Sequence, residues 1–305
     1  MVSKTTPRII ENIDTPQGLV FAVSAYVMWG VLPLYLKAVS HIPALEVVAH
    51  RVIWSVPVAA GLLIVLRRTN DLRAALRSPR TLAMACLTAA LITVNWFVYV
   101  WAVSTGHALD AALGYYINPL FSVFLGAVLL RERLDRAQVT AIGLAFAAVV
   151  VLTVEAGGLP WAALGLTLSW GFYAFLKKWL PVGPNQGFLL EVLILLIPAL
   201  GYAGYLGATG AGHFAASAGD TALLLGCGVI TAVPLITYAN GAKLLRLSTI
   251  GILQYIAPTM IFLVAVFVFE EPMGHARMIA FPMIWAALVL YSAAILRQAR
   301  RRRKS

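Results

Sequence analysis

Charged residues are scarce in this sequence. They make up 11% of 305 residues, whereas hydrophobic residues make up 61%, and the mean hydropathy is +0.87. A soluble domain typically carries about a quarter charged residues, so this composition excludes a soluble globular protein and indicates an integral membrane protein. Only two cysteines occur, Cys86 and Cys227, and both lie within apolar runs. We expect each to be a small buried side chain, and we predict neither a disulfide nor a metal site.

The motifs of soluble catalysis are also missing. The sequence contains no Gly-x(4)-Gly-Lys-Ser/Thr phosphate loop, no zinc-spaced His/Cys set and no Ser/His/Asp candidate for an active site. We therefore predict no catalytic residue, no cofactor and no ATP-driven transport by this chain alone. A membrane-embedded enzyme, such as a lipid-modifying protein, is a less favoured alternative that would have to use Glu46 and His50.

Ten long apolar runs dominate the chain. Each approaches the ~20 residues that a helix needs to cross ~30 Å of hydrocarbon, and backbone hydrogen bonding within a bilayer favours helices over open strands. We predict an all-α membrane protein with a leader at 1–16, five helices in 17–154, five in 155–297 and a basic tail at 298–305. The expected spans are 18–38, 44–66, 81–104, 109–130, 137–154, 159–179, 184–206, 219–241, 247–269 and 276–297.

Basic residues are distributed unevenly between the two ends of these spans. The leader, the tail, the even-numbered loops and the span ends beside them hold 20 of the 23 lysines and arginines, and only Lys37, Arg51 and Arg277 lie elsewhere. The positive-inside rule therefore predicts that both termini are cytoplasmic. We interpret the tail as a contact for anionic membrane lipids and not for nucleic acid.

One segment occurs twice. Residues 95–132 align with residues 234–271 without a gap, which matches Tyr99 with Tyr238, Tyr116 with Tyr255, Pro119 with Pro258 and Glu132 with Glu271. Because five spans per half is an odd number, the second half must enter the membrane from the opposite side. The halves are thus predicted to be inverted repeats, an architecture in which a substrate site forms between the halves near the midplane. We expect the two glutamates to hold a loop or cap a helix.

These landmarks resemble a known group of carriers. The paired Tyr-x(2)-Pro-x(12)-Glu stretches, the Trp-Gly of Trp29 that returns at Trp170, and five spans per repeat resemble the drug/metabolite transporter superfamily, and most closely its EamA-type family. The run from Glu46 to Ser55, which includes His50, Arg51 and Trp54, resembles the RarD-like branch, and the whole chain is similar to amino-acid exporters of the YddG type.

The resemblance implies a secondary transporter of the bacterial inner membrane. Its cavity would be lined mainly by the first, third, fourth, sixth, eighth and ninth helices, with the fifth and tenth at the back. The substrates would be amino acids, including aromatic and other apolar ones, exported by alternating access. The alternative substrates are drugs or metabolites of the chloramphenicol type.

Aromatic and amide side chains within these helices are candidates for binding the substrate. An aromatic, weakly polar cavity would hold an apolar side chain while hydroxyl and amide groups orient the zwitterion. Lipid contact explains such aromatics equally well, and the amides could instead bond carbonyls freed by the prolines. The candidates are Tyr99, Trp101, Tyr115, Asn118, Trp170, Tyr238 and Gln254, and the hinge candidates are Pro119 and Pro258.

Charged or titratable side chains within the second and seventh spans are further candidates, because a charge at depth costs about 2.5–3.5 kcal/mol on insertion scales. Glu46, His50 and Arg51 belong to the second span, and either an intrahelical ion pair, snorkelling, a substrate carboxylate or a proton relay would explain them. Glu191 in the seventh span either bridges to Lys177 or Lys178, or exchanges protons. The small residues Gly143, Ala147 and Ala148 suit either a dimer face or packing within the bundle, so the sequence leaves monomer and dimer open.

Overall fold

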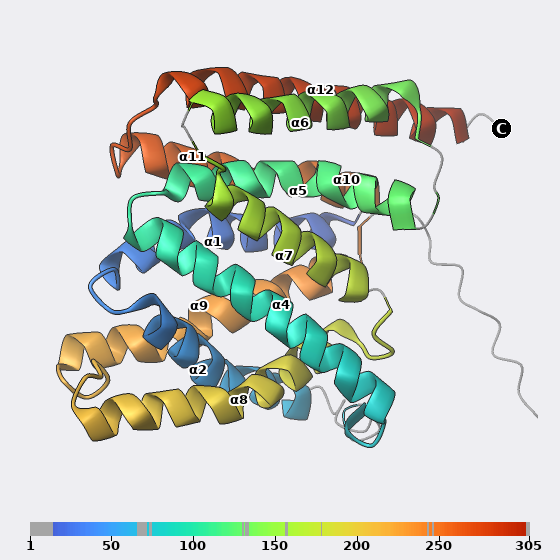
Figure 1. Cartoon of the computed structure of the whole chain (residues 1–305). Helices are drawn as coiled ribbons and strands as arrows, with labels where there is room; N and C mark the ends of the chain where they lie inside the picture. Colours follow the sequence, from blue (N-terminus) through green and yellow to red (C-terminus); the bar gives the residue numbers. More distant parts are fainter. Residues whose placement is uncertain are drawn as a thin grey trace, which may run out of the picture.

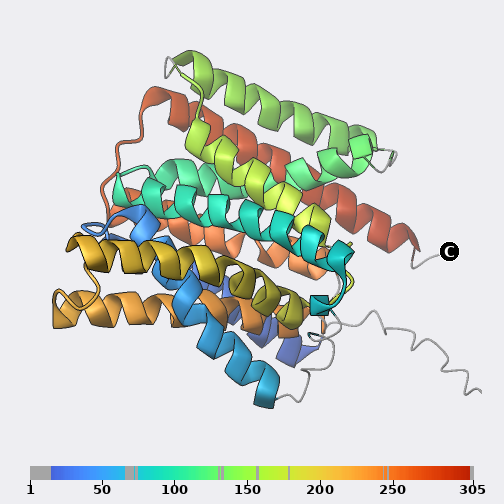
Figure 2. The same cartoon turned by 60° about the horizontal axis from the view of Figure 1, so that its bottom comes forward.

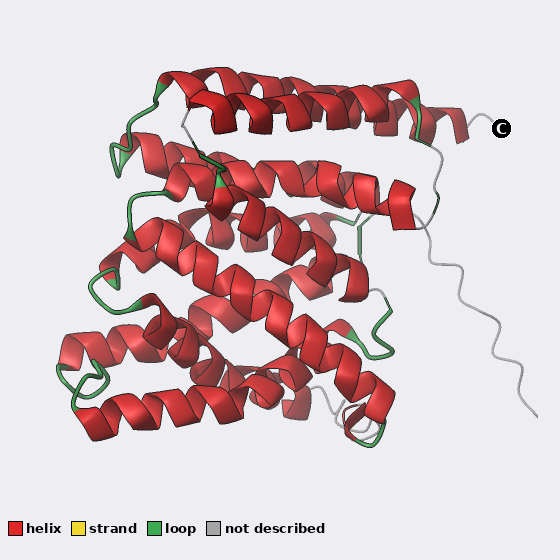
Figure 3. Cartoon of the chain, viewed as in Figure 1, coloured by secondary structure: helices red, strands yellow, loops and turns green. Residues whose placement is uncertain are grey.

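The structure is a computed structural model of the whole chain, which describes residues 15–65, 72, 75–129, 131, 134–155, 158–177, 179–242, 244–245 and 247–302. This described part is helical throughout, with short loops and no strand (Figure 3). In chain order the helices are α1 (Pro16–Ala38), α2 (Ala44–Val65), α4 (Pro79–Ser104), α5 (Ala108–Leu129), α6 (Arg136–Glu155), α7 (Trp161–Lys177), α8 (Pro184–Thr209), α9 (Ala218–Ala242), α10 (Leu247–Leu253), α11 (Ile256–Phe267) and α12 (His275–Arg302).

The ten predicted spans are confirmed, and the chain is a multi-pass membrane protein. Eight described helices are long and apolar enough to cross a membrane. The sixth span is α7, with 17 residues, and the ninth span is divided between α10 and α11. The last helix extends to Arg302 and so includes most of the segment predicted as a separate tail.

The helices pack as two inverted halves. Three contacts join a helix to its own counterpart: α2 to α8, α5 to α11, and α6 to α12. The other main contacts come in equivalent pairs, because α1 packs on α9 and α11 as α7 packs on α4 and α5, and α2 packs on α9 as α8 packs on α4. Helices of the two repeats are therefore packed against each other throughout the bundle. The α6–α12 pair forms one edge of the molecule (Figures 1 and 2), which confirms that the fifth and tenth helices pack at the back, and α2 and α8 lie toward the opposite edge in Figure 1.

The two faces of the bundle are defined by its ends. The first turn of α1 and the last turn of α12 lie on the same side, which we call the terminus face (right in Figure 1). The opposite side, the distal face, is formed by loops 39–43, 105–107, 158–160, 210–217 and 268–274. The landmark Glu132 lies outside the described residues.

The two candidate hinges differ. The ninth span is interrupted at Gln254 and Tyr255, four and three residues before Pro258. A proline removes its own N–H and its ring clashes with the carbonyl of the fourth preceding residue, and that residue is Gln254. Pro119, in contrast, lies inside an α5 that is continuous from Ala108 to Leu129. The sequence predicts a kink at both prolines, and the structure has a break only at the second.

Two small residues lie differently from expectation. Cys227 is buried, but Cys86 is exposed on α4, so its predicted burial is wrong. A position in an apolar run can face either the lipid or the core, so the run alone did not predict burial. Among the small residues of α6, Ala148 is fully buried and Gly143 is exposed on the same helix, which packs against α12.

Candidate functional site

The first feature of the site is a buried arginine on α2. Arg51 is only 3% exposed, and its Nε donates a hydrogen bond of 2.9 Å to Thr231 Oγ1 on α9. Its guanidinium carbon lies 4.9 Å from the ring centroid of Trp96 on α4. Thr231 is 13 residues from the start of α9, or about 20 Å along it, and therefore near the middle of that helix. Arg51 thus reaches inward to the other half and neither snorkels to an interface nor pairs within its own helix.

Two tyrosines from the predicted set belong to this cluster. The rings of Tyr99 on α4 and Tyr115 on α5 meet edge to face at 5.4 Å, and both side chains lie near Arg51. Tyr115 donates a hydrogen bond of 3.3 Å to the side-chain oxygen of Asn95. The amide nitrogen of Asn95 in turn bonds Ser169 on α7, at 3.1 Å. The cluster therefore joins α2, α4, α5, α7 and α9 from both halves.

A second aromatic cluster surrounds the repeat counterpart of Tyr99. Tyr238 on α9 packs against Tyr26 and Trp29 of α1, with ring centroids 5.7 and 5.5 Å apart, and these two contact each other at 5.6 Å. Tyr99 lies five residues before the distal end of α4, whereas Tyr238 lies four residues before the terminus-face end of α9. Of the two matched tyrosines, Tyr99 therefore lies nearer the distal face and Tyr238 nearer the terminus face. The sequence did not indicate Tyr26, because nothing in its spacing distinguishes it from other apolar positions of α1.

The remaining candidates lie with other partners. Trp101 stacks on His107 at 4.9 Å and meets Trp161 at 4.4 Å near the distal face. Trp170 contacts Tyr173 on its own helix, α7. The side-chain oxygen of Asn118 is buried and has no hydrogen-bond partner, whereas Gln254 lies at the α10–α11 break.

Buried carboxylates are all engaged. Glu46 accepts a hydrogen bond of 2.6 Å from the backbone N–H of His213 and lies 2.8 Å from its Nδ1. It does not pair with His50, whose Nδ1 accepts instead from Trp54 at 3.0 Å. The intrahelical pairing expected from the spacing of these residues is therefore replaced by a contact 167 positions away.

Glu191 forms the bridge that the sequence allowed. Its carboxylate lies 2.6 Å from Lys177 Nζ and accepts a 3.1 Å hydrogen bond from Tyr173. Glu191 is 1% exposed, and the lysine 21%. Lys178, the other lysine considered, lies outside the described residues.

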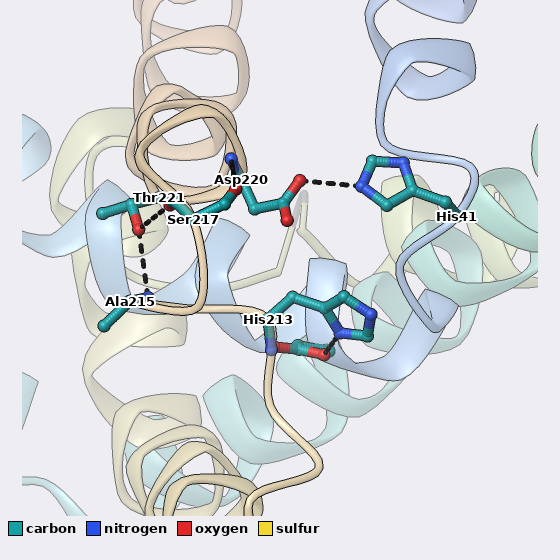
Figure 4. Close-up of polar contacts among 7 residues, drawn as sticks. His41, His213, Ala215, Ser217, Asp220 and Thr221 are labelled. Carbon is teal, nitrogen blue, oxygen red and sulfur yellow. Dashed lines mark hydrogen bonds and ion pairs between the residues drawn. The ribbon is translucent and has the colours of Figure 1, made fainter.

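The distal face is held by a set of polar contacts between the halves, which we call the distal seal. The Glu46–His213 contact belongs to it, and Figure 4 shows His41 pointing toward Asp220, with 2.7 Å between Nε2 and Oδ1. Glu271 accepts hydrogen bonds from the backbone N–H groups of Ala108 and Leu109, at 2.7 and 2.9 Å, and so caps α5 as a helix-terminal glutamate was expected to do. The seal is completed by Arg277–Asp110 at 3.0 Å and His275–Glu155 at 2.8 Å.

At the terminus face, Thr15 links the halves, because its N–H and its hydroxyl both donate to the backbone oxygen of Leu244. The histidines of the distal seal lie in loops or at helix ends, and sequence reasoning that considers only charges inside the spans does not detect them. Complementary charges in loops predicted on the same face were the available signal.

Repeat-matched positions differ in packing between the two faces. Val98, Tyr99 and Val100 are buried near the distal face, whereas their counterparts Thr237, Tyr238 and Ala239 near the terminus face are all partly exposed. The contrast is sharpest for Leu113 on α5, which is 1% exposed, and its counterpart Ile252 on α10, which is 45% exposed. Lipid contact would affect both members of a pair alike, so the difference reports closer packing of the bundle at the distal face.

Among the described residues, no group of three or more His, Cys, Asp or Glu side chains lies close enough to hold a metal ion. Glu46 and His50, the pair required by the enzyme alternative, are committed to separate partners. What the arrangement offers is a buried cation among aromatic rings, between two halves that are packed unequally at their ends.

Comparison with known proteins gives consistent matches. Residues 16–154 match the model of the EamA-like transporter family. Protein RarD of Streptomyces exfoliatus is 43% identical over 287 residues, which cover 94% of this chain and 91% of that protein. The uncharacterized transporter YojE of Bacillus subtilis is 40% identical over 290 residues, covering 93% of this chain and 96% of the relative.

More distant matches extend this set. The chloramphenicol-sensitive protein RarD of Pseudomonas aeruginosa is 33% identical over 293 residues, covering 94% of this chain and 98% of the relative. One crystal structure of a protein with 20% identity superposes with a TM-score of 0.59 over 92% of this chain and 98% of that chain, and it supports the fold alone.

Proposed function

Because this chain belongs to the EamA-like transporter family, in its RarD-like branch, we propose that it is a secondary transporter that exports amino acids, including aromatic and other apolar ones, by alternating access. The protein lies in the bacterial inner membrane, with both termini in the cytoplasm. The terminus face is then the cytoplasmic face, which agrees with its excess of lysine and arginine. The protein acts as a carrier and not as an enzyme.

One observation carries this proposal: repeat-matched segments are packed closely at the distal face and loosely at the terminus face. In a pair of inverted repeats, the closely packed face and the loosely packed face can exchange, because each repeat can adopt the packing of the other. The observed arrangement then corresponds to a carrier that receives its substrate from the cytoplasm, and the exchanged arrangement to one that releases it outside. The distal seal would break and re-form in each cycle.

The substrate class is supported by the aromatic clusters. Trp96, Tyr99 and Tyr115 surround one buried cation on the distal half, and Tyr26, Trp29 and Tyr238 form an aromatic set on the terminus half. Aromatic faces bind apolar and aromatic side chains, and edge hydroxyls orient polar groups. An amino acid with an apolar side chain presents both kinds of group.

A second candidate function is export of chloramphenicol-type compounds. It is favoured by the relative from Pseudomonas aeruginosa, whose name records chloramphenicol sensitivity. The same aromatic clusters would accept such a compound, so the two candidates must be separated by experiment.

The test is counterflow in proteoliposomes that contain the full chain and are preloaded with one unlabelled compound at a time. We expect labelled phenylalanine to accumulate faster when the lumen holds phenylalanine or leucine than when it holds buffer, with protein-free liposomes as the control. Repeating the assay at equal and unequal pH shows whether protons drive the exchange. Exchange with chloramphenicol but no amino acid would replace the substrate class, and exchange with none of these compounds would refute the proposal of amino-acid transport.

A further inference from the structure

Arg51 differs from every other buried charge among the described residues. Glu46 has His213, Glu191 has Lys177, and Glu271 has two backbone N–H groups. No carboxylate of a described residue lies within ion-pair distance of Arg51. Its electrostatic neighbours are Tyr99, Tyr115 and Cys227, which are ordinarily neutral at pH 7.

The buried donors around Arg51 are also incompletely used. Its Nη1 has no hydrogen-bond partner, and neither has the hydroxyl of Tyr99 or that of Ser55. Ser55 is 0% exposed and lies four positions after Arg51, on the same face of α2. Buried donors are normally paired, and leaving one unpaired destabilises the protein, more so when the donor is charged. These three buried polar groups lack a partner and the positive charge lacks a counter-charge, so a negatively charged acceptor would satisfy them.

The geometry also limits what that acceptor can be. The guanidinium carbon lies over the Trp96 ring and Nε donates to Thr231, so Nη1 is left for a second partner. A carboxylate offers two oxygens with about four lone pairs and matches the planar edge of an arginine. The surrounding rings of Trp96, Tyr99 and Tyr115 suit an apolar group attached to it.

We propose that Arg51 is the carboxylate subsite of this transporter. There a small amphipathic carboxylate supplies the missing counter-charge and accepts hydrogen bonds from Arg51, Ser55 and Tyr99. The inference rests on the proposed function and deepens it, because it makes the carboxylate a requirement for binding. Uncharged compounds of the chloramphenicol type would then be poor ligands. His50, the alternative on the same helix, is excluded from this role by its bond to Trp54 and its stacking on Phe214 at 4.9 Å.

The experiment measures binding to the purified full chain in detergent by the shift of the thermal midpoint, since a ligand stabilises the state that binds it. The probes are L-phenylalanine, L-phenylalaninamide and 3-phenylpropionate. The amide retains the side chain and the ammonium group but lacks the carboxylate, and 3-phenylpropionate has a carboxylate but no ammonium group. We expect the two carboxylates to bind at least about tenfold more tightly than the amide, as for a buried charge-assisted pair.

Variants assign this preference to one residue. Arg51→Gln is expected to abolish the preference for carboxylate over amide, and Tyr99→Phe to reduce it without loss of the charge. Lys37→Gln removes an exposed cation that lies over Phe269 at the distal end of α1, and it should leave the preference unchanged. The comparison of acid and amide on the unmodified chain needs no variant and therefore remains decisive if Arg51→Gln does not fold.

The outcomes for the two proposals are separable. Carboxylates that bind through Arg51 without any counterflow would refute amino-acid transport and leave the subsite standing. Counterflow that accepts the amide as readily as the acid would refute the subsite and leave the transporter standing. Equal binding of acid and amide to the unmodified chain, or no binding of any carboxylate, would also overturn the subsite.

Discussion

At the residue scale, the buried charges show how the chain tolerates ionised groups among apolar helices. Each buried carboxylate is matched by a donor from a different element, such as the ammonium group of Lys177 or the N–H groups at the start of α5. A buried ion pair often contributes no more to stability than well-packed apolar residues in its place. Loss of one partner is nevertheless strongly destabilising, because it leaves the other charge buried. A single substitution and a double substitution at one pair therefore have different expected effects.

Replacing Glu191 by Gln should destabilise the protein by about 3–5 kcal/mol, because Lys177 is then left largely buried without a counter-charge. The measurement is unfolding in detergent, with the double substitution Lys177→Met and Glu191→Leu expected to recover most of the loss. Glu155→Gln is the matched control, since its partner His275 is 78% exposed, and such a pair contributes only about 0–1 kcal/mol. Additive losses at Lys177 and Glu191 would contradict the coupling.

At the element scale, much of the architecture is readable from the sequence because it depends on local composition. Runs of apolar residues locate the ten spans, and the match of Tyr99 with Tyr238 locates the repeat. The contacts of the distal seal are not readable in this way. Glu46 and His213 lie 167 positions apart, and no local pattern determines that the start of α2 will pair with a distant loop on the same face. The break in the ninth span has a local cause in Pro258, but the same cause at Pro119 produces no break.

Replacing Pro258 by Ala should slow transport, and Pro119→Ala should slow it less. Alanine restores an N–H that can donate to the carbonyl of residue 254, and it lets α10 continue into α11. The α5 helix is already continuous through Pro119. Initial counterflow rates in proteoliposomes, compared at equal protein content, are expected to fall several-fold for the first substitution. Equal rates for both variants would show that the α10–α11 break has no part in the cycle.

At the scale of the whole molecule, the two halves have one fold and two different packings. Their matched positions provide pairs of probes that differ in surroundings but not in place within the repeat. Val100 is 1% exposed near the distal face, and its counterpart Ala239 is partly exposed near the terminus face.

Cysteine introduced at Ala239 should react with a membrane-impermeant maleimide from the terminus face, in a background with Cys86→Ser and Cys227→Ala. Cysteine at Val100 should react from the distal face at least about tenfold more slowly, because a minor conformer is typically populated at 0.1–10%. A transported substrate is expected to bring the two maleimide reaction rates closer together, since turnover exposes both positions in turn. Similar rates at the two positions without substrate would contradict the unequal packing.

The cap that Glu271 places on α5 also has a consequence for how the chain is made. The N–H groups of Ala108 and Leu109 belong to the fourth span, whereas their acceptor follows the ninth span, 162 or 163 positions later. A ribosome that adds about 5–20 residues per second inserts the first half well before this glutamate exists. The start of α5 must therefore wait for the end of synthesis to gain its partner. The first five helices do not constitute a finished unit, and the second repeat completes the first during assembly in the membrane.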